Sequence, residues 1–182
     1  MKKGFTLVEM LVVIAILGIL MAMMVPAAGM IMRRAAMARA QADAGVVTTV
    51  LMKYQAEYNR WPATYAAGTA SATDKDWVAM MAPQPDSGAI PLNPKRIVFF
   101  EPGAGALSTN GTYLGAFVDP WGNPYQYRVD EDGDGEVEGD EINSTGLVLA
   151  KPIRGRAIAW SLGPDGKEGT EADWEDNATS WE

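Results

Sequence analysis

The N-terminal part of the chain is an almost uninterrupted run of apolar residues from Phe5 to Val25. An α-helix rises about 1.5 Å per residue, so a helix over residues 5–25 is about 30 Å long. That length matches the hydrocarbon core of a bilayer. The pattern therefore predicts a transmembrane helix over residues 5–25.

Beyond Pro26 the apolar positions recur every three or four residues, which is typical of an amphipathic helix. The predicted stripe consists of Ile31, Ala35, Ala38, Ala42, Val46, Val50 and Tyr54. We expect it to pack on a sheet and to continue the first helix over residues 26–59. Pro26 removes one backbone hydrogen bond and is expected to kink or soften the helix. The helix is expected to end at 59–62, because the residue before a proline disfavours helical geometry.

Residues 60–182 show the short, alternating segments of a small globular head. A capping signal that begins at Thr73 predicts a short helix that ends at Met81. The predicted strands are Ile97–Phe100, Tyr113–Val118, Tyr125–Val129, Leu147–Ala150 and Ala157–Ser161. Their short connections favour antiparallel pairing. The predicted fold class is α+β, with a long N-terminal helix packed on a small antiparallel sheet.

Glu9 is the unusual residue of the apolar segment. A carboxylate within a membrane-length apolar run costs about 2.5–3.5 kcal/mol on insertion scales, so such residues usually have a function. An ordinary secretory signal has a shorter apolar region without an acid, and its small-residue cleavage site follows that region. Here the small residue after the charged leader is Gly4, ahead of the apolar segment. Cleavage there would retain the helix.

Residues 2–9 read Lys-Lys-Gly-Phe-Thr-Leu-Val-Glu and resemble the prepilin leader of type IV pilins and type II secretion pseudopilins. The resemblance implies that residues 1–4 are a leader, that a prepilin peptidase cuts between Gly4 and Phe5, and that Phe5 is N-methylated. It also implies that subunits polymerise through their apolar helices, with Glu9 neutralising the amine of a neighbouring subunit. Proteins of this family have a proline at the matching position, so the resemblance implies that the helix can unwind at Pro26 on assembly. The alternative is a static kink at the membrane surface. For the leader itself, the alternative is a simple signal anchor.

The amino-acid composition and the net charge exclude several kinds of catalysis and of binding partner. The chain has 182 residues and contains neither His nor Cys, which excludes His-based catalysis, thiol nucleophiles and disulfides. Its net charge of −8 argues against a nucleic-acid partner and favours cations. Basic residues flank the apolar segment on both sides, so the distribution of positive charge does not determine which end of the segment faces the cytoplasm. The family resemblance implies a single pass through the bacterial inner membrane with the head in the periplasm.

A densely acidic loop occupies residues 130–141 and has the spacing of a calcium loop. Its predicted ligands are Asp130, Asp132, Asp134, the backbone of Glu136, and Glu141. A predicted strand precedes the loop and no clear helix follows, which differs from a true EF-hand. The alternative is a solvated acidic turn.

Two further segments, Asp119–Tyr127 and Ser161–Gly166, resemble the major pseudopilin of type II secretion, its G subunit. The resemblance implies a C-terminal calcium loop, with ligands at the carbonyl of Leu162 and at Asp165, Asp173 and Asp176. A plain acidic tail is the alternative. The chain is longer than these pseudopilins, with additional sequence between Trp61 and Asp119 and in the acidic loop 130–141.

The sequence thus predicts a structural subunit of a type II secretion pseudopilus, with calcium as its cofactor. The implied partners are other copies of the chain, minor pseudopilins, the inner-membrane secretion platform, the prepilin peptidase and the membrane. One alternative is a major type IV pilin of a surface filament for adhesion, motility or DNA uptake. Another is a membrane-tethered calcium-binding module. No combination of nucleophile and base indicates an enzyme.

Overall fold

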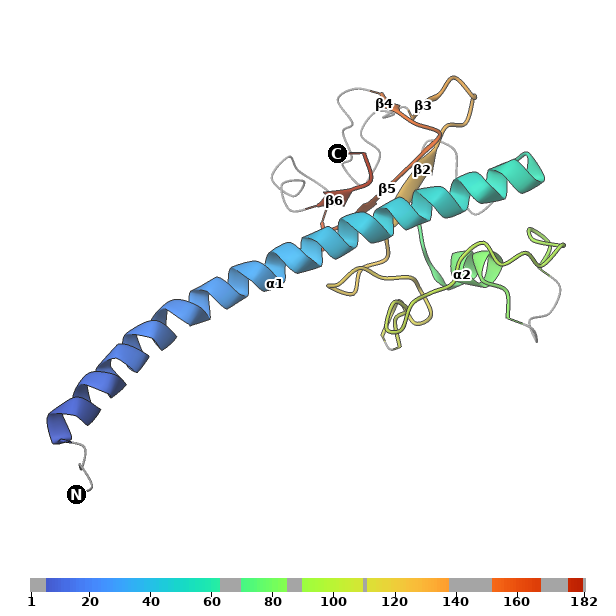
Figure 1. The fold of residues 1–182 in the computed structure, drawn as a ribbon. Helices are drawn as coiled ribbons and strands as arrows, with labels where there is room; N and C mark the ends of the chain where they lie inside the picture. Colours follow the sequence, from blue (N-terminus) through green and yellow to red (C-terminus); the bar gives the residue numbers. More distant parts are fainter. Residues whose placement is uncertain are drawn as a thin grey trace. The chain divides into compact units, whose positions relative to one another are not determined.

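The computed structural model describes residues 6–62, 70–84, 90–109, 111–137, 152–167 and 177–181, with the backbone alone at 23–28. The chain divides into two compact units, Met1–Ala36 and Met37–Glu182. Its elements are α1 (Leu7–Tyr58), β1 (Ser71–Ala72), α2 (Lys75–Met81), β2 (Gln126–Val129), β3 (Glu136–Val137), β4 (Ile153–Arg154), β5 (Ala157–Ser161) and β6 (Ala178–Thr179) (Figure 1).

The long N-terminal helix is confirmed. The backbone of α1 remains helical through position 26, so Pro26 does not interrupt it. The helix ends at Tyr58, because Asn59 adopts a left-handed conformation with φ of 51°. The Asn59 amide donates to the carbonyl of Gln55 at 2.8 Å, which completes the last turn. The helix thus ends four residues before Pro62.

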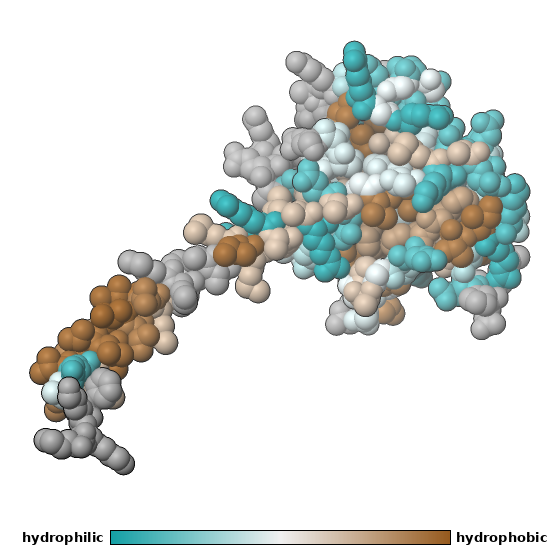
Figure 2. Space-filling view, viewed as in Figure 1, coloured by the Kyte–Doolittle hydropathy of each residue, from teal (hydrophilic) through white to brown (hydrophobic). Residues whose placement is uncertain are grey.

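The first unit presents apolar side chains on all sides of α1 between Leu7 and Met21. Leu7 is 81% exposed and Ile14 is 66% exposed. Figure 2 shows these apolar side chains gathered along the N-terminal part of the helix. Within the described ranges, no helix is both long enough and apolar enough to cross a membrane. The transmembrane helix over residues 5–25 stays a prediction.

The second unit contains a four-stranded antiparallel sheet in the order β1-β2-β5-β6 (Figure 1). Its longest ladder joins β2 to β5 and places Tyr127 opposite Ala159. The short strands β3 and β4 form a separate antiparallel pair. The predicted α+β fold with a small antiparallel sheet is confirmed.

Two of the predicted strands are observed as β2 and β5. Residues 97–100 are not a strand: the amides of Phe99 and Phe100 both donate to the carbonyl of Met81, at 2.8 and 3.1 Å. Residues 113–118 are mostly a turn, with only isolated bridges at Phe117 and Val118. The predicted strand 147–150 lies outside the described residues.

The predicted short helix is confirmed as α2. Its N-cap is Asp74, whose side chain accepts hydrogen bonds from the amides of Asp76 and Trp77. These bonds satisfy two amides that the first helical turn leaves without partners. The indole of Trp77 is fully buried and lies against the rings of Phe100 and Phe117. The sequence signal therefore positions a central core residue.

The predicted stripe on the second half of α1 is largely wrong. Ile31 is 66% exposed and Val46 is 40% exposed, and of the predicted positions only Val50 and Tyr54 are buried. The buried face consists instead of Ala40, Ala44, Val47, Val50, Leu51 and Tyr54. Apolar residues occupy several sides of this helix, so its own pattern does not select the buried face. The buried face is the one that packs against the aromatic side chains of the head.

Replacing Leu51 with Ala should destabilise the head by about 2–5 kcal/mol, because Leu51 is fully buried in the main core cluster. The matched control is Met52→Ala, one residue further on α1 and 43% exposed. Its effect should be within about 0.5 kcal/mol. Thermal unfolding of the full chain in detergent, followed by near-ultraviolet circular dichroism, measures both. Equal losses of stability in Leu51→Ala and Met52→Ala would contradict the burial of the Leu51 face of α1 in the core.

Candidate functional site

The start of α1 holds Glu9 in a capping box. The amide and the hydroxyl of Thr6 both donate to Glu9 Oε2 at 2.8 Å, and the Glu9 amide donates to Thr6 Oγ1 at 3.2 Å. This reciprocal pair fixes the carboxylate at the first helical turn. The sequence prediction named Glu9 and missed Thr6, although the Thr-x-x-Glu spacing is the signal for such a box. Gly4 and Phe5 lie outside the described residues.

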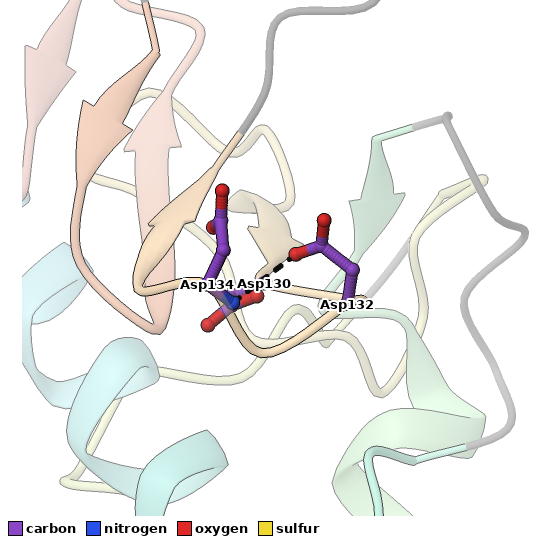
Figure 3. A group of neighbouring side chains, drawn as sticks. All are labelled: Asp130, Asp132 and Asp134. Atoms are coloured by element: carbon purple, nitrogen blue, oxygen red, sulfur yellow. Dashed lines mark hydrogen bonds between the residues drawn. The ribbon is translucent and has the colours of Figure 1, made fainter.

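The predicted acidic loop brings Asp130, Asp132 and Asp134 together between β2 and β3 (Figure 3). One carboxylate oxygen from each lies within 4.8 Å of the others, with Asp130 buried and the other two exposed. Calcium–oxygen distances are about 2.3–2.6 Å, so two ligands of one ion are at most about 5 Å apart. The three carboxylates therefore fit a common hard cation.

The loop wraps around the buried carboxylate of Asp130. Asp130 Oδ1 accepts from the Gly133 amide at 2.7 Å, and Oδ2 accepts from the Gly135 amide at 3.0 Å. Both glycines have positive φ angles, 84° and 88°, which residues with a Cβ rarely adopt. The indole Nε1 of Trp61 donates to the Asp130 carbonyl at 2.6 Å. This bond ties the loop to the segment that follows α1.

Two further ligands were predicted for this loop, Glu136 and Glu141, and the structure describes only the first of them. The carboxylate of Glu136 pairs with Arg154 at 3.6 Å across the β3–β4 ladder. Because this ion pair engages the carboxylate, the group of Glu136 that could bind calcium is its backbone carbonyl, as the calcium-loop spacing predicts. Glu141 lies outside the described residues.

The second predicted calcium loop begins with a tight turn directly after β5. Gly163 and Gly166 have φ angles of 66° and 68° in this turn. The Asp165 carboxylate accepts from the Lys167 amide at 2.9 Å. Asp173 and Asp176 lie outside the described residues.

Asn177, which was not among the predicted ligands, meets this turn through its side chain. One terminal atom of its amide lies 3.0 Å from the Leu162 carbonyl oxygen and 3.2 Å from that of Ser161. This atom is Nδ2, since a nitrogen can donate to both carbonyls. The Asn177 side chain therefore joins the start of β6 to the turn after β5 through two hydrogen bonds.

The two segments that resemble the major pseudopilin lie against each other in the structure. The buried Asp119 carboxylate accepts from the amides of Trp121 and Asn123 at 3.0 and 2.9 Å, and from Ser161 Oγ at 2.6 Å. Burial raises the pKa of the Asp119 carboxyl, while these hydrogen bonds oppose the rise. Asn123 Nδ2 donates to the Gly163 carbonyl at 3.0 Å. Residues 119–127 thus build the turn that supports residues 161–166.

Comparisons with known proteins agree with this architecture. Residues 1–25 match the family described as the prokaryotic N-terminal methylation motif. The chain is 28% identical over 168 residues to the type II secretion system core protein G of Pseudomonas aeruginosa, covering 92% of this chain and 87% of that protein. It is 28% identical over 176 residues to core protein G of Aeromonas hydrophila, covering 94% and 90%. The fimbrial protein EcpC of Eikenella corrodens is 40% identical over 72 residues, covering 40% of this chain and 47% of that protein. No solved structure matches the chain.

A methylation motif followed by a long helix and a small antiparallel sheet defines a type IV pilin-like protein. The similarity to core protein G extends across both the helix and the head. The chain is thus similar to the type II secretion core proteins G over most of its length, and its N-terminus matches the methylation motif. The family resemblance predicted from the sequence is confirmed.

Replacing Trp61 with Phe should lower the stability of the head by about 1 kcal/mol, because it removes the hydrogen bond to the Asp130 carbonyl and retains most of the ring. Trp121→Phe is the control, a half-buried tryptophan whose backbone amide binds Asp119. Thermal unfolding of the full chain in detergent compares the two variants. An unchanged midpoint for Trp61→Phe would contradict a stabilising role of this bond.

Proposed function

We propose that the chain is a structural subunit of a type II secretion pseudopilus. The observation that carries the proposal is its similarity to core proteins G over more than nine-tenths of its length. In this function the leader is cut between Gly4 and Phe5, residues 5–25 anchor the chain in the inner membrane, and the head lies in the periplasm. Polymerisation then extends a pseudopilus that drives protein export. The chain's role is structural and not catalytic.

The exposed apolar residues of α1 supply the surface for this assembly. They fit lipid before assembly and the helices of other subunits afterwards, since both environments are apolar. Cleavage would create an ammonium group at Phe5, about one helical turn from Glu9. An ion pair between this group and the Glu9 of a neighbouring subunit is much stronger in an apolar environment than in water. Thr6 holds the Glu9 carboxylate at the end of the helix, where an incoming amine can reach it.

Pro26 has a separate role in the proposal. A proline leaves one carbonyl of the preceding turn without its helical partner, so the helix is locally weaker there. We assign to this position the unwinding that accompanies assembly. The other partners are the prepilin peptidase, the minor pseudopilins and the inner-membrane platform of the secretion machine.

Calcium is the proposed cofactor of the C-terminal loop. The Leu162 carbonyl, Asp165, Asp173 and Asp176 supply hard oxygen ligands, which calcium prefers. Leu162 and Asp165 lie three residues apart at the tight turn after β5, and Asp165 is exposed, which supports the site. The chain has no cysteine, so a disulfide cannot hold this loop. A cation that binds only the folded loop stabilises the fold.

A second calcium ion is proposed for the acidic loop, held by Asp130, Asp132, Asp134, the Glu136 carbonyl and Glu141. The clustering of the three aspartate oxygens supports this site. Like charges at such spacing repel one another, and a divalent cation removes that repulsion.

A surface type IV pilin is the second candidate function. The similarity to fimbrial proteins of Eikenella corrodens and Neisseria meningitidis favours it, at 40% and 39% identity. Those similarities cover 40% and 41% of this chain, whereas the similarity to core protein G covers nearly all of it. The longer coverage favours the pseudopilin.

Deleting the chain should trap a defined set of folded export substrates in the periplasm, and restoring it should return them to the medium. Glu9→Ala should be processed to the shorter mature form and yet fail to restore export, because the buried amine of a neighbour stays unpaired. The control, Glu101→Ala, changes an exposed acid of the head and should restore export fully. Comparison of the proteins in the medium, with gel analysis of the precursor, measures these outcomes.

An unchanged set of exported proteins after deletion would contradict the pseudopilin function. Missing surface filaments in the same strain would then establish the pilin. Normal export with Glu9→Ala would contradict the proposed ion pair alone.

Removing calcium should lower the unfolding temperature of the full chain in detergent, since binding at 100 times the dissociation constant contributes about 2.7 kcal/mol. Asp165→Asn should reduce the calcium-dependent shift from the C-terminal loop, and Asp132→Asn with Asp134→Asn should reduce that from the acidic loop. Asp76→Asn, which changes an exposed acid in α2, is the control. Melting curves with EGTA, calcium or magnesium measure the shifts. Identical curves in all conditions would contradict both sites.

A further inference from the structure

Two adjacent arginines, Arg33 and Arg34, mark the end of the apolar stretch of α1. Apart from Glu9, no residue in the range 7–32 carries a polar or charged side chain, so these arginines are the first charged residues after Glu9. The residues just before them are apolar and exposed, with Met30 60% and Met32 74% exposed. The apolar surface of the first unit therefore extends as far as the arginines and ends there.

The place of this boundary along α1 fits the thickness of a whole bilayer. The backbone is helical throughout, and a helix over residues 7–32 is about 39 Å long. The hydrocarbon core of a bilayer is about 30 Å thick, and the bilayer with its headgroup regions measures about 40–45 Å. Helical side chains also lean toward the N-terminus of their helix, so long arginine side chains reach back toward the apolar stretch. With residues 7–32 in a bilayer, both guanidinium groups thus lie at the level of the lipid phosphates.

Helix α1 itself cannot neutralise these two charges. Ion pairs along a helix join residues three or four positions apart. The residues at those positions around the two arginines are all uncharged: Gly29, Met30, Ile31, Ala36, Met37 and Ala38. Arg39, in contrast, pairs with Asp43 at 3.5 Å. Within the part of the chain that the structure describes, Arg33 and Arg34 are both exposed and neither forms an ion pair.

The direction of the two side chains favours lipid headgroups over a carboxylate of another protein. Successive residues of an α-helix are rotated by about 100° around its axis, so Arg33 and Arg34 face different sides at nearly the same depth. A headgroup layer surrounds the helix on every side, whereas one acidic group of a neighbouring subunit could reach only one of them. A guanidinium also binds phosphate oxygens with two parallel N–H donors.

The surrounding charge favours anionic over zwitterionic lipids. No acidic residue occurs between Glu9 and Asp43, so the two positive charges are not offset in the sequence around them. Basic residues beside a membrane segment are attracted to anionic headgroups, and this attraction falls off within about 10 Å at ordinary salt concentrations.

We propose that Arg33 and Arg34 form a binding site for anionic phospholipids at the membrane surface where α1 leaves the bilayer. This inference rests on the membrane anchoring in the proposed function, and it holds equally for a pseudopilin and for a surface pilin. Bound headgroups hold the subunit in the membrane before polymerisation. Assembly then requires their release.

The test counts lipids bound to the full chain in a non-ionic detergent by native mass spectrometry. Phosphatidylglycerol is the anionic probe, phosphatidylcholine is the zwitterionic probe, and inorganic phosphate tests for phosphate binding without lipid. Each basic residue at an anionic surface strengthens binding about fivefold, so Arg33→Gln with Arg34→Gln should weaken phosphatidylglycerol binding about 25-fold. Arg33→Lys with Arg34→Lys keeps both charges and should bind this lipid like the parent chain. Glutamine and lysine both favour helices, so the two variants should fold.

Lys53→Gln with Lys75→Gln is the matched control, since it removes two exposed positive charges from the head and should leave lipid binding unchanged. Equal weakening in this control would overturn the proposal, because net charge alone would then explain the effect. Undiminished binding of phosphatidylglycerol to Arg33→Gln with Arg34→Gln would also overturn it, as would equal binding of phosphatidylcholine to the parent chain. Displacement of the lipid by an equal concentration of inorganic phosphate would identify free phosphate as the ligand and overturn a lipid site.

The lipid measurement and the export assay separate two kinds of failure. Unchanged export after deletion of the chain would contradict the pseudopilin function without affecting lipid binding by the purified protein. Undiminished lipid binding by Arg33→Gln with Arg34→Gln, together with loss of export in the same variant, would replace the lipid site by a contact between subunits.

Discussion

Burial of one α1 face against the aromatic residues of the head is the interaction on which the second unit depends. Leu51 and Tyr54 lie in the same core cluster as Trp77, Tyr125 and Tyr127, so the helix, α2 and the sheet share a single apolar interior. Apolar burial stabilises by about 25 cal/mol per Å², and aromatic side chains contribute the largest areas. The four-stranded sheet is small, and the helix supplies the second layer that it needs to bury its inner side.

Each loop proposed to bind calcium is organised by one buried aspartate. Asp130 accepts the amides of two glycines in the acidic loop, and Asp119 joins the turn after β5 to the turn before β2. Both carboxylates are less than 5% exposed, and both are satisfied by donors from the chain. Such buried anions order the surrounding backbone, because each carboxylate accepts hydrogen bonds from backbone amides. Local order in these loops thus comes from buried charge and not from a large core.

Under the proposed function, the two units have different solvents and different sources of stability. The exposed apolar side chains of the first unit suit lipid or neighbouring helices, while the acidic head has a net negative charge and suits an aqueous compartment that contains cations. A cysteine-free head cannot rely on disulfides to hold its loops. Calcium would take that role, and its concentration would then influence the stability of the subunit.

Local sequence patterns determined the long helix, the cap at Asp74 and the two longest strands, because helical spacing, capping side chains and alternation act between near neighbours. They also pointed to Glu9 and the acidic loop. Only the tertiary structure decided which α1 face is buried, since apolar residues lie on several sides of that helix. It alone brought Asp119 to Ser161, which are 42 residues apart, and Asn177 to Leu162. Contacts across such separations depend on how the sheet and turns pack, which no local pattern encodes.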